Sequence, residues 1–155
     1  MASEIERKFL LASDTWRAAV TSTADYCQGY MANTEKASFR IRVAGDKAYL
    51  NIKGATLSIE RTEYDYAIPV EDGREMLSRF CMGELIEKRR HIVPYEGHRW
   101  EIDVFTGINE GLVMAEIELS RVDEEFARPP WLGDEVSHDA RYYNVYLARH
   151  PFPTW

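Results

Sequence analysis

Four short segments of the chain place charges of one sign two residues apart. Two of these segments are basic and contain Arg40 with Arg42, and Lys88 with Arg90. Arginine side chains bind phosphate oxygens through paired hydrogen bonds, and lysine adds a compact positive charge. Because like charges at this spacing repel each other unless something binds between them, the two pairs indicate a wall that binds phosphate groups.

The other two segments are acidic and contain Glu101 with Asp103, and Glu116 with Glu118. Clustered carboxylates bind hard divalent cations, and Mg²⁺ prefers a few carboxylates together with water and phosphate oxygens. Basic and acidic clusters in one chain therefore predict a site that holds a metal ion and a polyphosphate together.

Strands must position these side chains, because residues two apart in a strand point to the same face. Seven segments alternate polar and apolar residues with this period, at residues 3–10, 38–43, 49–54, 58–68, 87–93, 99–105 and 112–119. Their polar faces carry fifteen ionisable side chains with a net charge of −1. Seven are basic: Lys8, Arg40, Arg42, Lys53, Arg61, Lys88 and Arg90. Eight are acidic: Glu4, Glu6, Glu63, Asp65, Glu101, Asp103, Glu116 and Glu118.

Helical patterns are fewer and shorter than the strand patterns. They follow Ser13–Asp14, cover about residues 70–81, begin at Ser120 with a capping box to Asp123, and begin near Ser137. Seven or eight strands with four short helices predict one α+β domain over residues 1–155, built on an antiparallel sheet. Closure would remove exposed strand edges, so we expect a curled or closed sheet with its charged faces inside and its apolar faces packed outward under the helices.

A simpler interpretation is an antiparallel sheet with one solvated face. Solvent-facing strand positions favour threonine, serine and β-branched residues, however, and here ions occupy nearly all of them. The grouping of the signs by strand also speaks against this alternative.

The composition limits the function classes. The 155 residues carry a net charge of −7 and give a pI near 5.1, which argues against a general nucleic-acid binder. No apolar run is long enough for a signal peptide or a membrane span, so we expect a cytoplasmic protein without membrane association. Cys27 and Cys81 lack metal-ligand spacing and are interpreted as ordinary buried thiols.

In order along the chain, the charged segments resemble those of the CYTH superfamily, the triphosphate tunnel metalloenzymes. The hallmark E-x-E-x-K corresponds to Glu4, Glu6 and Lys8 in EIERKFL. Further matches are SFRIRV, LNIKG, RTEYDY, EKRRHIV, WEIDVF, MAEIEL and GDEVSHDARYYNVYLA. The short chain and RPPWLGDEV are most similar to small bacterial members that hydrolyse inorganic triphosphate.

The resemblance implies an eight-stranded antiparallel barrel around a polar tunnel, with activity that depends on Mg²⁺ or Mn²⁺. By this resemblance, all seven basic residues of the strand faces would bind the triphosphate. The metal would be held by Glu4, Glu6, Glu63, Asp103, Glu116 and Glu118. Homodimers are frequent in the family, so a homodimer is possible here.

The resemblance also matches Tyr30 with a tyrosine that lies near a catalytic lysine, here Lys88, and a general-base role for this pair is a hypothesis. Asn51 and Ser137 replace threonines of the family pattern. The expected reaction is metal-assisted hydrolysis of tripolyphosphate to pyrophosphate and phosphate. Alternatives are class IV adenylyl cyclase or thiamine-triphosphatase activity in the same tunnel, and a non-catalytic polyphosphate-binding module.

Overall fold

The computed structural model describes residues 2–155. Within this range the strands are β1 (Ser3–Leu11), β2 (Ser22–Asn33), β3 (Ala37–Ala44), β4 (Lys47–Gly54), β5 (Glu60–Ile68), β6 (Met82–Tyr95), β7 (His98–Thr106), β8 (Val113–Glu118) and β9 (Leu132–Glu135). The α-helices are α1 (Val70–Arg79) and α2 (Asn144–Leu147). The 3₁₀ helices are η1 (Thr15–Ala19), η2 (Gly107–Asn109), η3 (Ala140–Tyr142) and η4 (Phe152–Thr154).

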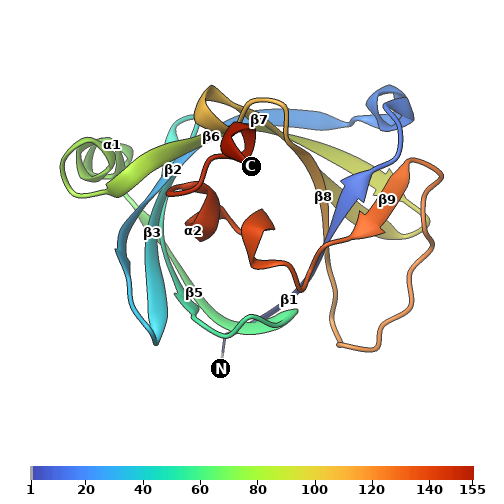
Figure 1. The fold of residues 1–155 in the computed structure, drawn as a ribbon, viewed down its shortest axis with the longest axis horizontal. Helices are drawn as coiled ribbons and strands as arrows, with labels where there is room; N and C mark the ends of the chain where they lie inside the picture. Colours follow the sequence, from blue (N-terminus) through green and yellow to red (C-terminus); the bar gives the residue numbers. More distant parts are fainter. Residues whose placement is uncertain (1) are drawn as a thin grey trace.

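The strands form one antiparallel sheet in the order β5-β4-β3-β2-β6-β7-β8-β1-β9. A further pairing of β1 with β5, through Ser3–Ile5, closes the first eight strands into a barrel, which Figure 1 shows end-on. Strand β9 pairs with the end of β1 beyond this closure. The predicted eight-stranded antiparallel barrel is therefore confirmed, with one additional short strand.

The apolar faces of β1 and β6–β8 build the core outside the barrel. Phe9, which alternates with the inward-facing Lys8, packs edge-to-face on Trp100, and Trp100 packs in the same way on Trp131. All three aromatic residues are buried. The segment between β8 and β9 supplies Trp131 and Phe126 to this cluster. Aromatic packing, more than helices, thus covers this side of the barrel.

A second apolar cluster lies inside the barrel, because those of its members that belong to strands occupy inward-facing positions. It contains Tyr30, Ile86, Phe105, Leu112 and Met114, together with Leu147 and Ala148 from the C-terminal segment. In Figure 1 this C-terminal segment, with α2, lies across one end of the barrel. The lumen is therefore polar over part of its length and apolar at this end.

Hydrogen bonds fix the C-terminal segment to β1. The hydroxyl of Ser137 accepts a hydrogen bond from the backbone N–H of Lys8 at 2.9 Å. The hydroxyl of Tyr143 donates a hydrogen bond to the backbone carbonyl of Ser137 at 2.6 Å. Beyond α2, the Trp155 indole packs on Tyr142 and donates to the carbonyl of His150 at 3.0 Å. The aromatic tail is thus folded back onto the segment that crosses the barrel end.

Two sequence-based expectations for elements were wrong or incomplete. The helix expected from Ser120 is absent. The Glu124 carboxylate accepts hydrogen bonds from the backbone N–H and the hydroxyl of Ser120 and also contacts His98, and these contacts hold the segment in a turn. Strand β2 was not identified as a strand from its pattern. The helix expected over residues 70–81 is present as α1, and the segments after Ser13 and Ser137 form only short helices. Over residues 2–155, no helix has both the length and the apolar character that crossing a membrane requires.

Helix α1 packs closely on the barrel through Gly73. A Cβ at this position would lie 2.5 Å from the Cβ of Ala48 and 3.3 Å from Cγ2 of Val43. We expect Gly73→Ala to lower the free energy of unfolding by about 1–3 kcal/mol through overpacking, although alanine is the better helix former by about 1 kcal/mol. Urea denaturation measures this. Ala48→Gly in the same chain removes the closer contact and should recover part of the loss, whereas a G73A variant as stable as the wild type would contradict this packing.

Candidate active site

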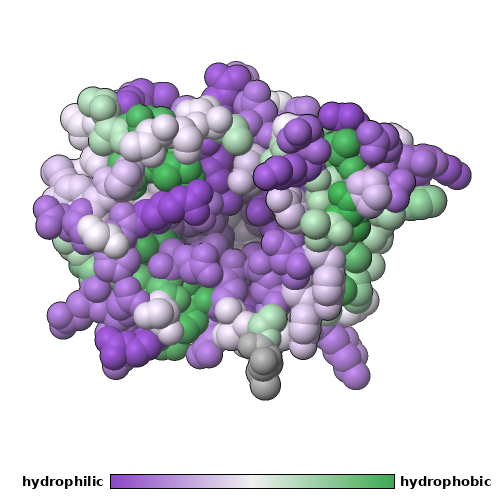
Figure 2. Space-filling model, turned by 180° about the vertical axis from the view of Figure 1, so that it is seen from behind, coloured by the Kyte–Doolittle hydropathy of each residue, from purple (hydrophilic) through white to green (hydrophobic). Residues whose placement is uncertain are grey.

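A cavity of about 230 Å³ occupies the polar part of the lumen. Figure 2 shows a hollow surrounded by hydrophilic residues on the face opposite to that of Figure 1. Its charged lining consists of six acidic and six basic side chains: Glu4, Glu6, Glu63, Glu101, Glu116 and Glu118, with Lys8, Arg40, Arg42, Lys53, Arg90 and Arg99. Tyr26 and Asn144 complete it.

Lys8 is bound to two carboxylates in the wall of the cavity. Its Nζ lies 2.9 Å from Glu6 and 2.7 Å from Glu116, and only 4% of the residue is exposed. Burial alone would lower the pKa of Lys8, but Glu116 and Glu6 outweigh this effect and raise it. The ammonium group therefore stays charged.

A second ionic cluster joins β6 to β7. Arg90 donates two hydrogen bonds to Asp103, at 2.8 and 2.9 Å, and forms an ion pair with Glu101. The Nζ of Lys88 lies 2.8 Å from the same Asp103 carboxylate. Burial alone would raise the pKa of Asp103, but Arg90 and Lys88 lower it to about 2. Asp103 is thus a counter-charge shared by two buried cations, of which Arg90 also has Glu101.

Lys88 itself is completely surrounded by protein. Burial, reinforced by Arg90 and Arg42, outweighs Asp103 and lowers the pKa of Lys88 to about 7. Among the described residues its Nζ has no hydrogen-bond partner, so its contact with Asp103 is an ion pair without hydrogen-bond alignment. The same Nζ lies 5.5 Å from the ring centroid of Phe105, at the border between the polar lumen and the apolar cluster.

Arg40 and Arg42 differ from the other basic residues of the lumen. Within residues 2–155, neither has a carboxylate at ion-pair distance. Neutral amide oxygens hold them instead: Asn51 accepts from Arg40 at 3.0 and 3.1 Å, and Gln28 accepts from Arg42 at 3.0 Å. Burial, together with Arg40 and Arg90, lowers the pKa of Arg42 to about 10. This pair is uncompensated positive charge, which favours an anion.

Carboxylates gather elsewhere on the wall. Glu118 has no ion-pair partner in the part of the chain that the structure describes. Burial, followed by the negative charges of Glu4 and Glu6, raises its pKa. Burial and Glu116 likewise raise the pKa of Glu6. Such mutual repulsion favours a bound cation.

The donor set suits a hard divalent cation, which takes oxygen ligands. Besides the repelling carboxylates, buried Oε2 atoms of Glu4 and Glu63 have no hydrogen-bond partner among the described residues, although both lie near the Lys53 ammonium. Over the same residues, no three acidic, histidine or cysteine side chains converge as a ready-made set of ligands. The residues fit a cation that also takes ligands from water and phosphate.

The structure brings ten of the predicted site residues into the cavity wall. Lys88 and Asp103 lie behind Arg90, and Tyr30 lies in the inner apolar cluster without a recorded contact to Lys88. The sequence interpretation did not place Tyr26 or Arg99 at the site. Arg99 lies two residues before Glu101 on the same strand face, so the period-two pattern could have identified it. Tyr26 lies on β2, which lacks charged inward positions.

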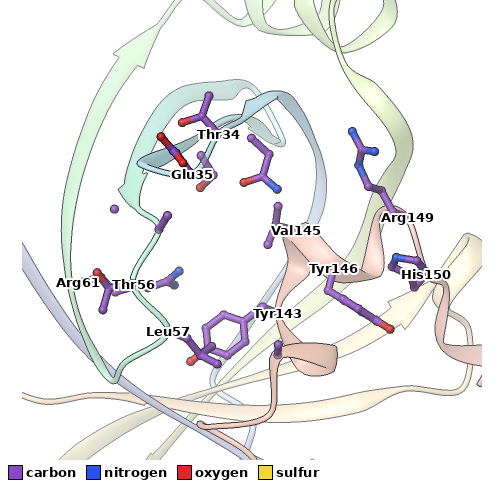
Figure 3. A pocket seen from close by; sticks show the side chains of 15 residues that line it. Thr34, Glu35, Thr56, Leu57, Arg61, Tyr143, Val145, Tyr146, Arg149 and His150 are labelled. Atoms are coloured by element: carbon purple, nitrogen blue, oxygen red, sulfur yellow. The ribbon is translucent and has the colours of Figure 1, made fainter.

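Arg61 lies between the tunnel and a second cavity of about 500 Å³. Its guanidinium is 4.0 Å from Glu4 and 5.1 Å from the ring centroid of Tyr143. Figure 3 shows this cavity between the β2–β3 and β4–β5 connections and the C-terminal helices, with Tyr146 and His150 on its wall.

The comparisons with known proteins agree with this geometry. The family model of the CYTH domain matches residues 2–144. An inorganic triphosphatase of Acetivibrio thermocellus is 43% identical over 152 residues, covering 98% of this chain and 97% of the relative. An inorganic triphosphatase of Nitrosomonas europaea is 35% identical over 151 residues, which cover 94% of this chain and 97% of that relative.

Solved structures show the same similarity. A crystal structure of an inorganic triphosphatase superimposes with a TM-score of 0.68 at 34% identity, covering 96% of this chain and 95% of that one. A protein from Hippeastrum, described as having a dominant triphosphatase activity, gives a TM-score of 0.56 at 16% identity, with coverages of 78% and 80%. The latter similarity concerns the fold alone.

Asp103 provides a test of the ionic cluster. We expect Asp103→Asn to lower the free energy of unfolding by about 3–5 kcal/mol, because it leaves Arg90 and Lys88 buried without their shared anion. Urea denaturation at neutral pH measures the change. Asp25→Asn is the matched control, since it breaks an exposed pair with Arg89 and should cost less than about 1 kcal/mol. Equal losses in the two variants would contradict the role assigned to Asp103.

Proposed function

The chain belongs to the CYTH domain family, and on that premise we propose that it hydrolyses inorganic triphosphate to pyrophosphate and phosphate with the help of Mg²⁺ or Mn²⁺. The family implies a divalent metal, and the choice between these two ions is part of the proposal. The observation that carries it is the lumen, which combines uncompensated arginines with a group of mutually repelling carboxylates.

We assign binding of the triphosphate to the basic residues of the lumen. Arg40 and Arg42 would form the strongest contacts, because a phosphate oxygen need not compete there with a carboxylate. Lys8 and Lys53 already have anionic partners, so they would share their donors between the protein and the ligand. The full proposed set is Lys8, Arg40, Arg42, Lys53, Arg61, Lys88 and Arg90.

We assign the metal to the carboxylates of the lumen, Glu4, Glu6, Glu63, Asp103, Glu116 and Glu118. Glu118 and Glu6 are the most suitable, since repulsion by neighbouring carboxylates would be relieved by a cation. Asp103 is the least available, because its carboxylate is bound by two cations. When bound, the metal would neutralise phosphate oxygens and stabilise charge on the attacking and leaving groups.

The chain's own residues would act mainly by positioning the phosphates and compensating their charge, which is what phosphoryl transfer requires. Lys88 is proposed as the group that accepts a proton from the attacking water, because its Nζ is buried at the end of the polar lumen without a hydrogen-bond partner among the described residues. Tyr30 on the neighbouring strand β2 is proposed to assist it, since its ring belongs to the apolar cluster at the same end of the lumen.

A second candidate is an organic triphosphate, such as a nucleotide or thiamine triphosphate. The 500 Å³ cavity favours it, because Arg61 belongs to both that cavity and the tunnel region. Comparing turnover of tripolyphosphate, ATP and thiamine triphosphate, together with a cyclic AMP assay, separates the two candidates. Turnover of tripolyphosphate well above the others supports the first.

The proposed partner is a small-molecule triphosphate. We propose no partner among nucleic acids or membranes, and the net charge of −7 supports the exclusion of nucleic acids. A homodimer and a cytoplasmic location stay predictions from the sequence. Light scattering of the purified protein measures the oligomeric state.

The proposed reaction predicts phosphate release from tripolyphosphate in the presence of Mg²⁺, and loss of this release when EDTA removes the metal. The Lys88→Ala, Glu116→Ala double variant should fall to background, because it removes a cation and a carboxylate from the same lumen. Arg74→Ala on exposed α1 serves as the control. Release no greater than that of the double variant would reject the triphosphatase assignment.

The role of Lys88 can be separated from its charge. Arginine keeps the positive charge but does not accept a proton at neutral pH. If Lys88 is the base, Lys88→Arg and Lys88→Ala should both lower kcat by about 10²–10⁴-fold. A K88R variant that retains most of the wild-type kcat would instead indicate that Lys88 acts only through its charge.

A further inference from the structure

Gln28 is a buried polar residue in the middle of β2 for which no role has been assigned. Its position on the inward face follows from its register, opposite Arg42 on β3 and Ile86 on β6. It is 0% exposed, and the polar cavity lies on the far side of Arg42. An amide buried this completely needs partners for both its oxygen and its nitrogen.

The oxygen has such a partner in Arg42. The Nε of Arg42 donates to Oε1 of Gln28 at 3.0 Å. Because the acceptor is neutral, the bond fixes the direction of the guanidinium without cancelling its charge. The terminal nitrogens of Arg42 make no hydrogen bond to a described residue, so they are available to an anion in the cavity that Arg42 lines.

Tyr26 supports the same guanidinium from a second direction. Its ring centroid lies 5.0 Å from Cζ of Arg42 and 4.9 Å from Cζ of Arg90. Stacking on an aromatic face holds a guanidinium without supplying a counter-charge. Arg42 is thus positioned by two neutral side chains of β2.

The nitrogen of Gln28 gives an independent observation. Its Nε2 is buried and has no hydrogen-bond partner among the described residues. The orientation of the amide is fixed by Arg42, which requires the oxygen on its own side. A buried donor without an acceptor is unfavourable, so the amide at this position is accounted for by its hydrogen bond to Arg42 and not by a bond of Nε2.

We propose that Gln28 is a positioning residue for the phosphate site: its hydrogen bond holds the guanidinium of Arg42 in an orientation that leaves the terminal nitrogens of Arg42 available to a bound phosphate. This inference rests on the proposed function and deepens it. It distinguishes Arg42 from the basic residues that the protein has already paired with carboxylates.

The test compares Gln28→Glu with Gln28→Leu. In Q28E a carboxylate of the same size faces Arg42 and neutralises it, so KM for tripolyphosphate should rise about tenfold or more while kcat changes little. Q28L removes the hydrogen bond that orients Arg42 and should raise KM by about three- to fivefold. Ser78→Glu on exposed α1 adds the same charge far from the lumen and should leave KM unchanged.

Thermal unfolding establishes which variants fold. If Q28E does not fold, KM is measured for the uncharged variant Q28L. If Q28L does not fold either, Gln28→Met takes its place. A KM within twofold of the wild type in the folded variants, or a loss confined to kcat, overturns the proposal. If the wild type shows no turnover, the proposed function fails. Calorimetric titration of the wild type and variants with tripolyphosphate and Mg²⁺ then still tests Gln28, and equal affinities would overturn it.

Discussion

The compensation of buried charge is the constraint on which the rest of the structure depends. Moving an ion from water into a protein costs several kcal/mol even after relaxation, unless opposite charges and hydrogen bonds replace the water. The barrel meets this requirement strand by strand, as Lys8 lies between Glu6 and Glu116, and Asp103 lies between Lys88 and Arg90. The registers between the strands therefore determine which charged side chains form ion pairs.

The groups that lack this compensation determine which ligands the lumen can bind. Arg40 and Arg42 have amide partners in place of carboxylates, whereas Glu118 lacks a cation among the described residues. A protein that only needed stability would gain by pairing these groups with each other. Their separation leaves a positive region and a negative region within one cavity, an arrangement that suits a phosphate chain bound together with a cation.

The sequence predicted a curled or closed antiparallel sheet because charges at a spacing of two residues leave few alternatives to a strand with a charged face, and the family resemblance implied the eight-stranded barrel. The same rule failed for β2, whose inward residues Tyr26, Gln28 and Tyr30 are not acidic or basic residue types. It identified eleven residues of the cavity wall, but not which of them lack partners, because pairing depends on the registers between strands. The inner apolar cluster was also beyond prediction, since Leu147 reaches it from the far end of the chain.

The net charge of −7 and the capacity to bind a polyphosphate are compatible because the cavity itself is balanced. Including Arg99, its lining has six acidic and six basic side chains, so the excess negative charge lies elsewhere on the protein. A balanced lining does not attract a multiply charged anion as a whole, and it is best matched by ligands whose charges also balance. A polyphosphate is thus expected to occupy the lumen together with divalent cations. Long-range attraction is weak in such a site, and selectivity depends on local contacts such as those of Arg42.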